Sequence, residues 1–296
     1  MDLSKTLKNL LTYTIENKGS DLHICPGASP FIRVGGKLTK IEIEPLNFND
    51  IKNILEDSYM LDAEKKKKMH TDHSVAYSFS ISGLGRFRAC TYLQRGTMAV
   101  TIRILPYVIP TLDALGYGNE YNSLIKDFAS YNKGLFLILG DTGTGKSSTL
   151  AAIIDHLNTT ASMHITTIEH PIEYLHAHKN SIVTQKEMGA DVSDLKTALK
   201  WAVTQNADVI ALDNINKNES DIMLTVTAAE EKLVFACMKA VSSIDNASEY
   251  FGEAFTSEST GKMKRLSNTL KGVMHQYYDG GVFTAHITRN PLNPKI

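Results

Sequence analysis

The stretch from Gly134 to Leu150 restricts the possible folds more than any other part of the chain. It contains an apolar run, then a glycine-rich turn, then the start of a helical pattern. Within it, residues 140–147 read Gly-Asp-Thr-Gly-Thr-Gly-Lys-Ser and match the phosphate-binding pattern G-x-x-x-x-G-K-[ST] at every fixed position. In that pattern a buried strand leads into the loop, and the following helix directs its N-terminus at the phosphates. A chance glycine-rich turn would lack the flanking strand and helix, so we expect a P-loop here.

Each part of this loop has an expected task. The glycines let backbone N–H groups curl around phosphate oxygens. Lys146 should reach the outer phosphates of a nucleotide, and the Ser147 hydroxyl should take a place on Mg²⁺. The residues expected to bind ATP are Gly140, Thr142, Gly143, Thr144, Gly145, Lys146, Ser147 and Ser148.

Two later apolar segments end in acidic residues. Residues 164–169 read as a strand that delivers Glu169 to its carboxyl end, beside the place where phosphates should lie. Residues 208–214 form a second apolar strand that ends in Asp213, which is the form of a Walker B strand. Such a carboxylate helps to hold Mg²⁺, so we expect Asp213 and Ser147 to be the protein's metal ligands.

Composition excludes several classes of protein. Hydrophobic residues make up 43% and charged residues 21% of the 296 residues, as in an ordinary globular protein. The net charge of −1 provides no global field for nucleic acid, so we expect no nucleic-acid partner. The three cysteines are too scattered for a disulfide framework or a metal knuckle, which fits a reducing compartment. Without a signal-peptide pattern or a long apolar stretch, a cytoplasmic location is expected.

The chain divides by pattern into two parts. Residues 1 to about 106 read as helices combined with antiparallel strands, and Pro106 and Pro110 mark a linker. The remainder alternates strand and helix patterns, which predicts a mostly parallel sheet covered by helices. The run Lys65–Lys68 could suggest phosphate binding, but a solvated helix face is the commoner explanation and the one we favour.

The order of these motifs resembles the secretion and pilus motor ATPases, most closely the type IV pilus retraction (PilT) group. The similarity covers the chain from its first helix to about residue 288. The four-cysteine metal module of the extension and type II secretion relatives is absent, which favours the retraction side. The segments that carry the resemblance are Ser20–His23, Pro30–Gly36, Gly85–Arg88, Ile102–Pro106, Lys146–Ala152, Thr167–Glu173 and Leu224–Glu230.

This resemblance implies a PAS-like α+β domain over residues 1–106, a linker over 107–118 and a RecA-like P-loop domain over 119–296 that is short at its C-terminus. It implies MgATP as ligand and a hexameric ring of identical subunits with nucleotide at the boundaries. A paralogous motor ATPase and an inner-membrane pilus platform protein are the implied partners, which would place the protein peripherally at that membrane. The implied catalytic residues are Glu169, Asp213, Arg88 and Arg103.

The roles of these residues are not equally determined. Arg88 and Arg103, with Arg95, could stabilise phosphate charge from a neighbouring subunit, or they could cap and solvate strands. Glu169 is the best candidate to orient or activate the attacking water.

The sequence also departs from the family pattern. His170 replaces an aspartate of the acidic box, and Asp213-Asn214 stands where Gly-Glu is usual. The two histidines of the histidine box are absent, with Lys239 at the second position. Two functions therefore remain open at this stage. One is a motor ATPase with weakened hydrolysis, and the other is a non-hydrolysing ATP-binding subunit that partners an active paralogue. A nucleic-acid translocase on the same fold lacks a basic face and ranks below both.

Overall fold

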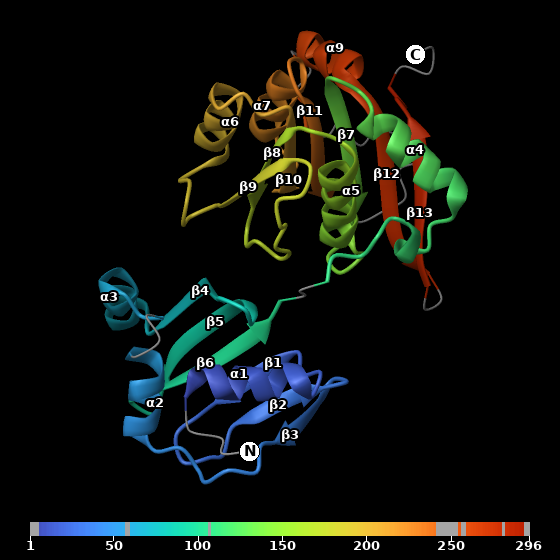
Figure 1. The fold of residues 1–296 in the computed structure, drawn as a ribbon. Coiled ribbons are helices and arrows are strands. Elements are labelled where there is room, and N and C mark those ends of the chain that lie inside the picture. Colours follow the sequence, from blue (N-terminus) through green and yellow to red (C-terminus); the bar gives the residue numbers. More distant parts are fainter. Residues whose placement is uncertain are drawn as a thin grey trace. The chain divides into compact units, whose positions relative to one another are not determined.

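The computed structural model describes residues 6–56, 60–105, 108–240, 254–255, 259–279 and 282–292 (Figure 1). It divides into two compact units, Met1–Tyr107 and Val108–Ile296. Pro106 and Tyr107, where the expected linker begins, lie outside the described residues, as do residues 293–296. The segment that follows contains a short 3-10 helix, η1 (Asp113–Leu115).

The first unit contains a six-stranded sheet in the order β3-β2-β1-β6-β5-β4, with antiparallel pairing throughout. The turn between β2 and β3 uses Gly35 and Gly36 at φ of 55° and 81°, the positive values that a two-residue hairpin turn requires. The strands are β1 (Asp21–Ile24), β2 (Phe31–Val34), β3 (Lys37–Lys40), β4 (Ser74–Ile81), β5 (Gly85–Gln94) and β6 (Thr97–Ile104).

One face of this sheet packs against three helices, α1 (Leu7–Glu16), α2 (Phe48–Glu56) and α3 (Ala63–Asp72). Their apolar residues share a single core with the inward-facing residues of the strands. The four-lysine run lies on α3, where three of the four side chains are exposed and two pair locally with acids of the same helix or its cap. The interpretation of this run as a solvated helix face is therefore confirmed.

The second unit contains a seven-stranded sheet in the order β13-β12-β7-β11-β10-β8-β9. All neighbours pair in parallel except β12 and β13, which pair antiparallel, so the mostly parallel sheet predicted from the sequence is confirmed. The strands are β7 (Gly134–Gly140), β8 (His164–Glu169), β9 (Ile182–Glu187), β10 (Val209–Ile215), β11 (Leu233–Lys239), β12 (Leu270–Asp279) and β13 (Val282–Arg289).

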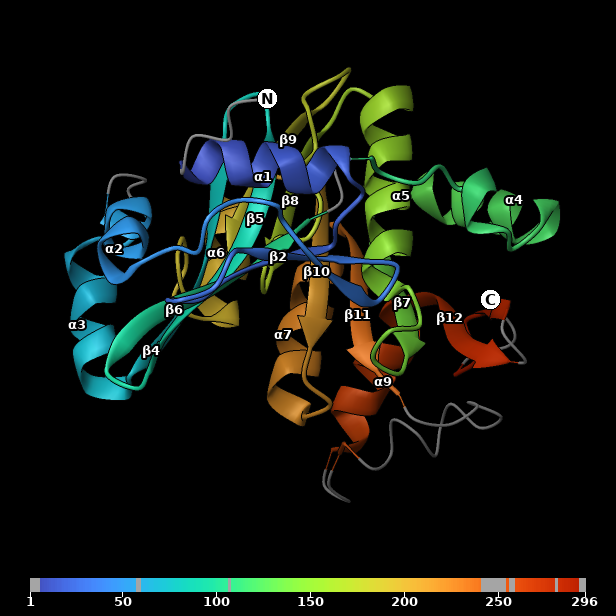
Figure 2. The ribbon, with the colours of Figure 1, turned by 90° about the horizontal axis from the view of Figure 1, so that it is seen from below.

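Helices cover both faces of this sheet. One layer consists of α4 (Asn119–Ala129) and α5 (Lys146–Thr160), and the other of α6 (Leu195–Thr204), α7 (Glu219–Ala229) and α9 (Thr260–Thr269). Figure 2 shows α5 and α7 on opposite sides of the strands. Among the described residues, no helix has both the length and the apolar character needed to cross a membrane.

An aromatic cluster fills the core on the α5 face. The ring centroids of Phe128 and Phe136 lie 4.7 Å apart, and those of Phe136 and Phe235 lie 5.7 Å apart. All three side chains are fully buried. Gly272 on β12 lies directly against this cluster, because a Cβ at that position would be 2.5 Å from Phe128 Cζ. Residue 272 therefore has no room for a side chain.

We predict that Gly272→Ala destabilises the protein by about 1–3 kcal/mol, because the enclosed ring of Phe128 cannot move aside. Gly261→Ala is the matched control. Gly261 lies in α9 with open space around it, so the change should be neutral or slightly stabilising. Urea unfolding of both variants measures the difference, and equal stabilities would contradict the packing described here.

Candidate nucleotide-binding site

The P-loop joins the buried strand β7 to helix α5 and has the geometry that its glycines allow. Gly143 and Gly145 adopt φ of 86° and 88°, a region that residues with a side chain rarely enter. At Gly140 a Cβ would lie 2.5 Å from the carbonyl oxygen of Gln276 and 2.6 Å from Thr144 Oγ1, so only glycine fits. The spacing of the motif is thus a requirement of the backbone path.

The start of α5 offers backbone donors to an anion. Its N-cap is Gly145, which has no side chain to accept a hydrogen bond from the first turn. By contrast, α6 and α7 are capped by the side chains of Asp194 and Asn218, which accept from backbone N–H groups. The first N–H groups of α5 therefore remain available, and the helix dipole adds partial positive charge at the same place.

Asp141 organises the loop through its carbonyl oxygen and its carboxylate. Its carbonyl oxygen accepts hydrogen bonds from Lys146 Nζ at 2.7 Å and from Thr144 Oγ1 at 2.9 Å. Its carboxylate accepts one from the backbone N–H of Thr142 at 2.7 Å. The Lys146 ammonium thus folds back onto the loop and stays half-exposed at its mouth.

The end of β10 directs Asp213 toward the P-loop helix. Val209 and Ala211 pack in the core on the α5 face, and Asp213 continues their alternation. A bulge follows, because Asp213 and Asn214 together lie opposite the single residue Cys237 of β11. The Ser147 hydroxyl hydrogen-bonds to Asp213, and the buried Oδ1 atom of Asp213 has no hydrogen-bond partner in the described part of the chain.

Glu169 occupies the same edge of the sheet, at the end of β8. Its side chain is only 8% exposed. Oε1 accepts hydrogen bonds from the Thr167 hydroxyl and, at 3.0 Å, from Gln185 Nε2. Gln185 also donates to the carbonyl oxygen of Tyr174 at 2.8 Å, so its amide is held from both sides. The structure thus fixes one carboxylate oxygen of Glu169 firmly.

Burial shifts the acid–base behaviour of both acids. Burial raises the pKa of Glu169 to about 7, and the nearby charge of Asp213 adds to this shift. Hydrogen bonds from Thr167 and Gln185 act in the opposite direction and lower the pKa. Burial also raises the pKa of Asp213 to about 6, and the proximity of Glu173 adds to that shift, whereas Ser147 and Lys146 oppose it. Two acids with raised pKa values beside a lysine are typical of a functional site.

The donor set fits a magnesium ion that is partly held by its nucleotide. Among the described residues, no group of three or more His, Cys, Asp or Glu side chains could form a complete metal cage. Mg²⁺ is ordinarily held by one or two protein oxygens together with phosphates and water. Ser147 and the unpartnered oxygen of Asp213 provide such a pair.

The two arginines expected at the site lie on the other unit, on the sheet face that α1–α3 do not cover. Arg88 and Arg103 are cross-strand neighbours on β5 and β6. Arg103 donates from Nε to Asp21 Oδ1 at 3.0 Å, whereas Arg88 makes no ion pair with the described residues. Burial by itself would raise the pKa of Asp21, but hydrogen bonds from Ser20 and Arg103 outweigh this effect and hold the pKa below its usual value.

Sequence reasoning missed two residues at this edge. Gln185 lies on β9, opposite Thr167 of β8, and nothing in the local sequence indicates that pairing. Tyr174 was also missed, although its hydroxyl lies 2.8 Å from Ser148 Oγ on α5. Both contacts depend on which strands and loops become neighbours, and no short motif encodes that.

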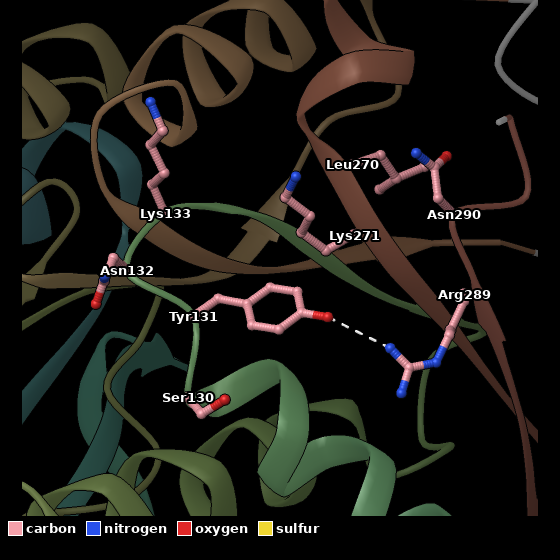
Figure 3. A pocket seen from close by; sticks show the side chains of 8 residues that line it. All are labelled: Ser130, Tyr131, Asn132, Lys133, Leu270, Lys271, Arg289 and Asn290. Atoms are coloured by element: carbon pink, nitrogen blue, oxygen red, sulfur yellow. Dashed lines mark hydrogen bonds between the residues drawn. The ribbon is translucent and has the colours of Figure 1, made fainter. Parts of the chain in front are cut away.

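A cavity of about 560 Å³ lies elsewhere in the second unit (Figure 3). It opens beside Gly134 at the start of β7, whereas the P-loop follows Gly140 at the other end, about 20 Å away along the strand. Arg289 donates to the Tyr131 hydroxyl there at 3.3 Å and pairs with Asp127 at 2.7 Å. This cavity is therefore separate from the phosphate site. Its lining is Ser130, Tyr131, Asn132, Lys133, Leu270, Lys271, Arg289 and Asn290.

The chain is similar to known proteins over nearly its whole length. Residues 2–276 match the family described as "Type II/IV secretion system protein". The type IV pilus retraction ATPase PilT of Pseudomonas aeruginosa is 31% identical over 286 residues, which cover 95% of this chain and 81% of PilT. The type IV pilus ATPase PilU of the same organism is 31% identical over 270 residues, or 91% of this chain and 69% of PilU.

Solved structures agree with the sequence relatives. The crystal structure of the pilus retraction motor PilT with bound ADP aligns with a TM-score of 0.84 and 31% identity, over 96% of this chain and 83% of that one. The Legionella pneumophila ATPase DotB has the same fold, with a TM-score of 0.78 at 19% identity over 95% of this chain and 79% of its own. The resemblance and the fold class predicted from the sequence, a PAS-like α+β unit followed by a RecA-like P-loop unit, are confirmed.

We predict that Glu169→Gln stabilises the ligand-free protein at pH 8. In the folded state burial raises the pKa of Glu169 from the ordinary 4.5 to about 7. The contribution of Glu169 to the free energy of unfolding is therefore full below pH 4.5 and is lost as pH rises through 7. Removing the buried charge should gain on the order of 2–3 kcal/mol at pH 8. The amide keeps an oxygen that can accept from Thr167 and Gln185.

Urea unfolding at several pH values, without nucleotide or magnesium, measures this effect. The gain over wild type should shrink steadily as the pH falls toward 4.5. A Gln variant that is less stable than wild type at pH 8 would show that the ionised carboxylate is well solvated or paired in the folded state.

Proposed function

The chain belongs to the type II/IV secretion system protein family, and on that premise we propose that it is a motor ATPase of a type IV pilus that acts in retraction. The observation that carries the proposal is the complete P-loop with Asp213 beside Ser147 and Glu169 buried on the same sheet edge. Hydrolysis of ATP by water to ADP and phosphate is the reaction. Its free energy would drive movement between subunits.

Binding of ATP would rearrange the loop around Lys146. The ammonium would exchange the carbonyl oxygen of Asp141 for phosphate oxygens, and the uncapped N-terminus of α5 would donate to the same anion. Mg²⁺, held by Ser147 and Asp213, would neutralise charge on the phosphates. The buried Oδ1 of Asp213 supports this, because that atom has no hydrogen-bond partner among the described residues.

Glu169 is the proposed general base. A water molecule would attack the γ-phosphorus and pass a proton to this carboxylate, while the bond to the β-phosphate oxygen breaks. A base works best when its pKa lies near the working pH, and burial brings the pKa of Glu169 to about 7. Hydrogen bonds from Thr167, from Gln185 and from the backbone of Glu173 hold the carboxylate in place to accept this proton.

Completion of the site would require another copy of the chain. Arg88 and Arg103 are proposed to reach the phosphates of a neighbouring subunit, which makes a head-to-tail contact that closes into a ring, as a hexamer. Arg88 is the freer of the two, because Asp21 holds Arg103. A paralogous motor ATPase and an inner-membrane platform protein are the proposed partners at the cytoplasmic side of the membrane.

We predict that Lys146→Ala lowers affinity for MgATP by roughly 10- to 100-fold and abolishes measurable phosphate release, because it removes a charge-assisted bond at the phosphates. Lys200→Ala, which removes an exposed lysine of α6, is the control and should behave as wild type. Fluorescent-nucleotide titration and phosphate release measure the two quantities. Equal affinity of Lys146→Ala and wild type would refute the site, and no phosphate release by wild type would refute the motor function.

We further predict that Asn214→Glu raises turnover with little change in nucleotide affinity. Asn214 is exposed beside Asp213 and cannot accept a proton, whereas a positioned base contributes ~10²–10⁴ in rate. Asn214→Gln keeps the amide and lengthens the side chain by one methylene. It controls for the larger side chain, and its turnover should not rise above that of wild type. Phosphate release at saturating MgATP is the measurement. A lower rate in the Glu variant alone would show that a second carboxylate disturbs Asp213.

A further inference from the structure

The cavity at the amino end of β7 is built from three segments that lie far apart in the chain (Figure 3). They are residues 130–133 between α4 and β7, the first two residues of β12, and residues 289–290 at the end of β13. The volume of about 560 Å³ is that of a pocket for a small ligand.

A β-bulge places Lys271 at this cavity. Leu270 and Gly272 of β12 pair with two consecutive residues of β7, so Lys271 between them is an extra residue in the strand. The bulge also changes the face of the sheet. Leu270 packs in the core on the α7 face, whereas Gly272 lies against Phe128 on the α5 face. Bulges commonly redirect a side chain in this way beside a binding site.

The side chain of Lys271 lies across Gly134, the first residue of β7. A Cβ at residue 134 would be 2.6 Å from Lys271 Cγ and 2.8 Å from its Cε, so the lysine stem occupies the room that a side chain there would need. The ammonium group of Lys271 makes no ion pair or hydrogen bond with the described residues. Its position is therefore fixed by packing, and its charge is available to a ligand.

Two further cations line the same cavity. The guanidinium of Arg289 lies 5.4 Å from the centroid of the Phe128 ring. Nη1 of Arg289 donates to the Tyr131 hydroxyl at 3.3 Å and Nη2 to Asp127 at 2.7 Å, which holds the group in place with further N–H donors to spare. Lys133 is exposed and makes no ion pair with the described residues. In the view of Figure 3, Lys271 lies between Lys133 and Arg289.

The balance of charge at the cavity is positive, because its lining contains three cations and no acid. Asp127 offsets part of the charge of Arg289, as does the carbonyl end of α4. A hydrogen bond from an arginine of α9 lowers the pKa of Glu230, and Lys133 contributes to the same shift, so this acid offsets part of the charge of Lys133. Lys271 is left as the cation that neither acid pairs with.

We propose that this cavity binds the phosphate group of a small soluble phosphate monoester. The site is separate from the P-loop, and the proposal does not depend on the chain being a motor ATPase. Such a group carries nearly two negative charges at pH 7 and has three strong acceptor oxygens. Lys271, Arg289 and Lys133 supply one cation for each oxygen. A carboxylate has one charge and two oxygens in one plane, so it would leave a cation unmatched.

Glycerol 3-phosphate is the probe, and titration calorimetry on the full chain with saturating MgADP measures its binding. We expect a dissociation constant on the order of 0.1–1 mM. Lys271→Met should weaken binding by about 10-fold, because it removes a charge-assisted hydrogen bond but keeps a stem over Gly134. Lys200→Met makes the same substitution at an exposed lysine of α6, so it is the matched control and should bind as wild type does.

Lys146→Ala separates the cavity from the P-loop. An ester bound in the cavity keeps its affinity in Lys146→Ala and loses affinity in Lys271→Met. Lys133→Met is the second cavity variant and should weaken binding to a smaller extent, and it decides the question if Lys271→Met fails to fold. No binding to wild type, or binding that depends on Lys146 and not on the cavity lysines, overturns the proposal.

Two other ligands test the chemical class and its source. Succinate offers two carboxylates and should bind several-fold more weakly, so equal affinity for succinate and glycerol 3-phosphate overturns the choice of phosphate. Phosphatidylcholine vesicles that contain phosphatidic acid offer the same monoester on a lipid. Sedimentation with these vesicles, without binding of glycerol 3-phosphate, would assign the cavity to a membrane and overturn the soluble ligand. Phosphate release from MgATP is measured separately, so failure here leaves the proposed motor function standing.

Discussion

The parallel pairing of β7, β11, β10 and β8 is the constraint on which the site depends. Parallel strands bring their carboxyl ends to one edge, and the alternation of side chains then selects one face of that edge. Asp213 and Lys239 continue the alternation of apolar residues that pack toward α5, and Glu169 continues that of Ile165 and Thr167, so all three share the face on which the P-loop helix begins. Residues far apart in the chain therefore come together because of the order of the parallel strands and the alternation of their side chains.

The same edge is electrostatically unfavourable without a ligand. Burial holds the pKa of Glu169 near 7 and that of Asp213 near 6, because each carboxylate loses water and faces other acids. Burial of these acids costs stability, and functional sites commonly carry such a cost. MgATP would compensate the charge at Asp213 through the metal, and Lys146 would compensate charge on the phosphates.

The sequence predicted features that lie within one short stretch and missed contacts between residues far apart in the chain. The P-loop was predictable because strand, glycines and helix lie in one short stretch, and α5 begins at Lys146 within the motif itself. Asp213 was predictable because it ends an apolar strand. Gln185 was not, because its contact with Glu169 requires β9 to pair with β8, and pairing depends on the whole chain. Lys239 was noted only as a missing histidine, since its place beside Gly140 also requires the strand order.

The proposed contact between copies of the chain would act on the cations of the P-loop. Within the second unit, Lys146 and Lys239 lie at the P-loop, and both contact Asp141. On the first unit, Arg88 and Arg103 are cross-strand neighbours on the sheet face that α1–α3 do not cover, and of these two arginines only Arg103 pairs with Asp21. A phosphate that draws Lys146 away from the carbonyl oxygen of Asp141 would change the charge at the mouth of the loop. An arginine approaching from another copy would encounter that change directly, because electrostatic attraction at close range depends on which partner each cation already has. Exchange of partners among a few exposed cations is therefore a sufficient physical means for nucleotide state to alter the contact between subunits.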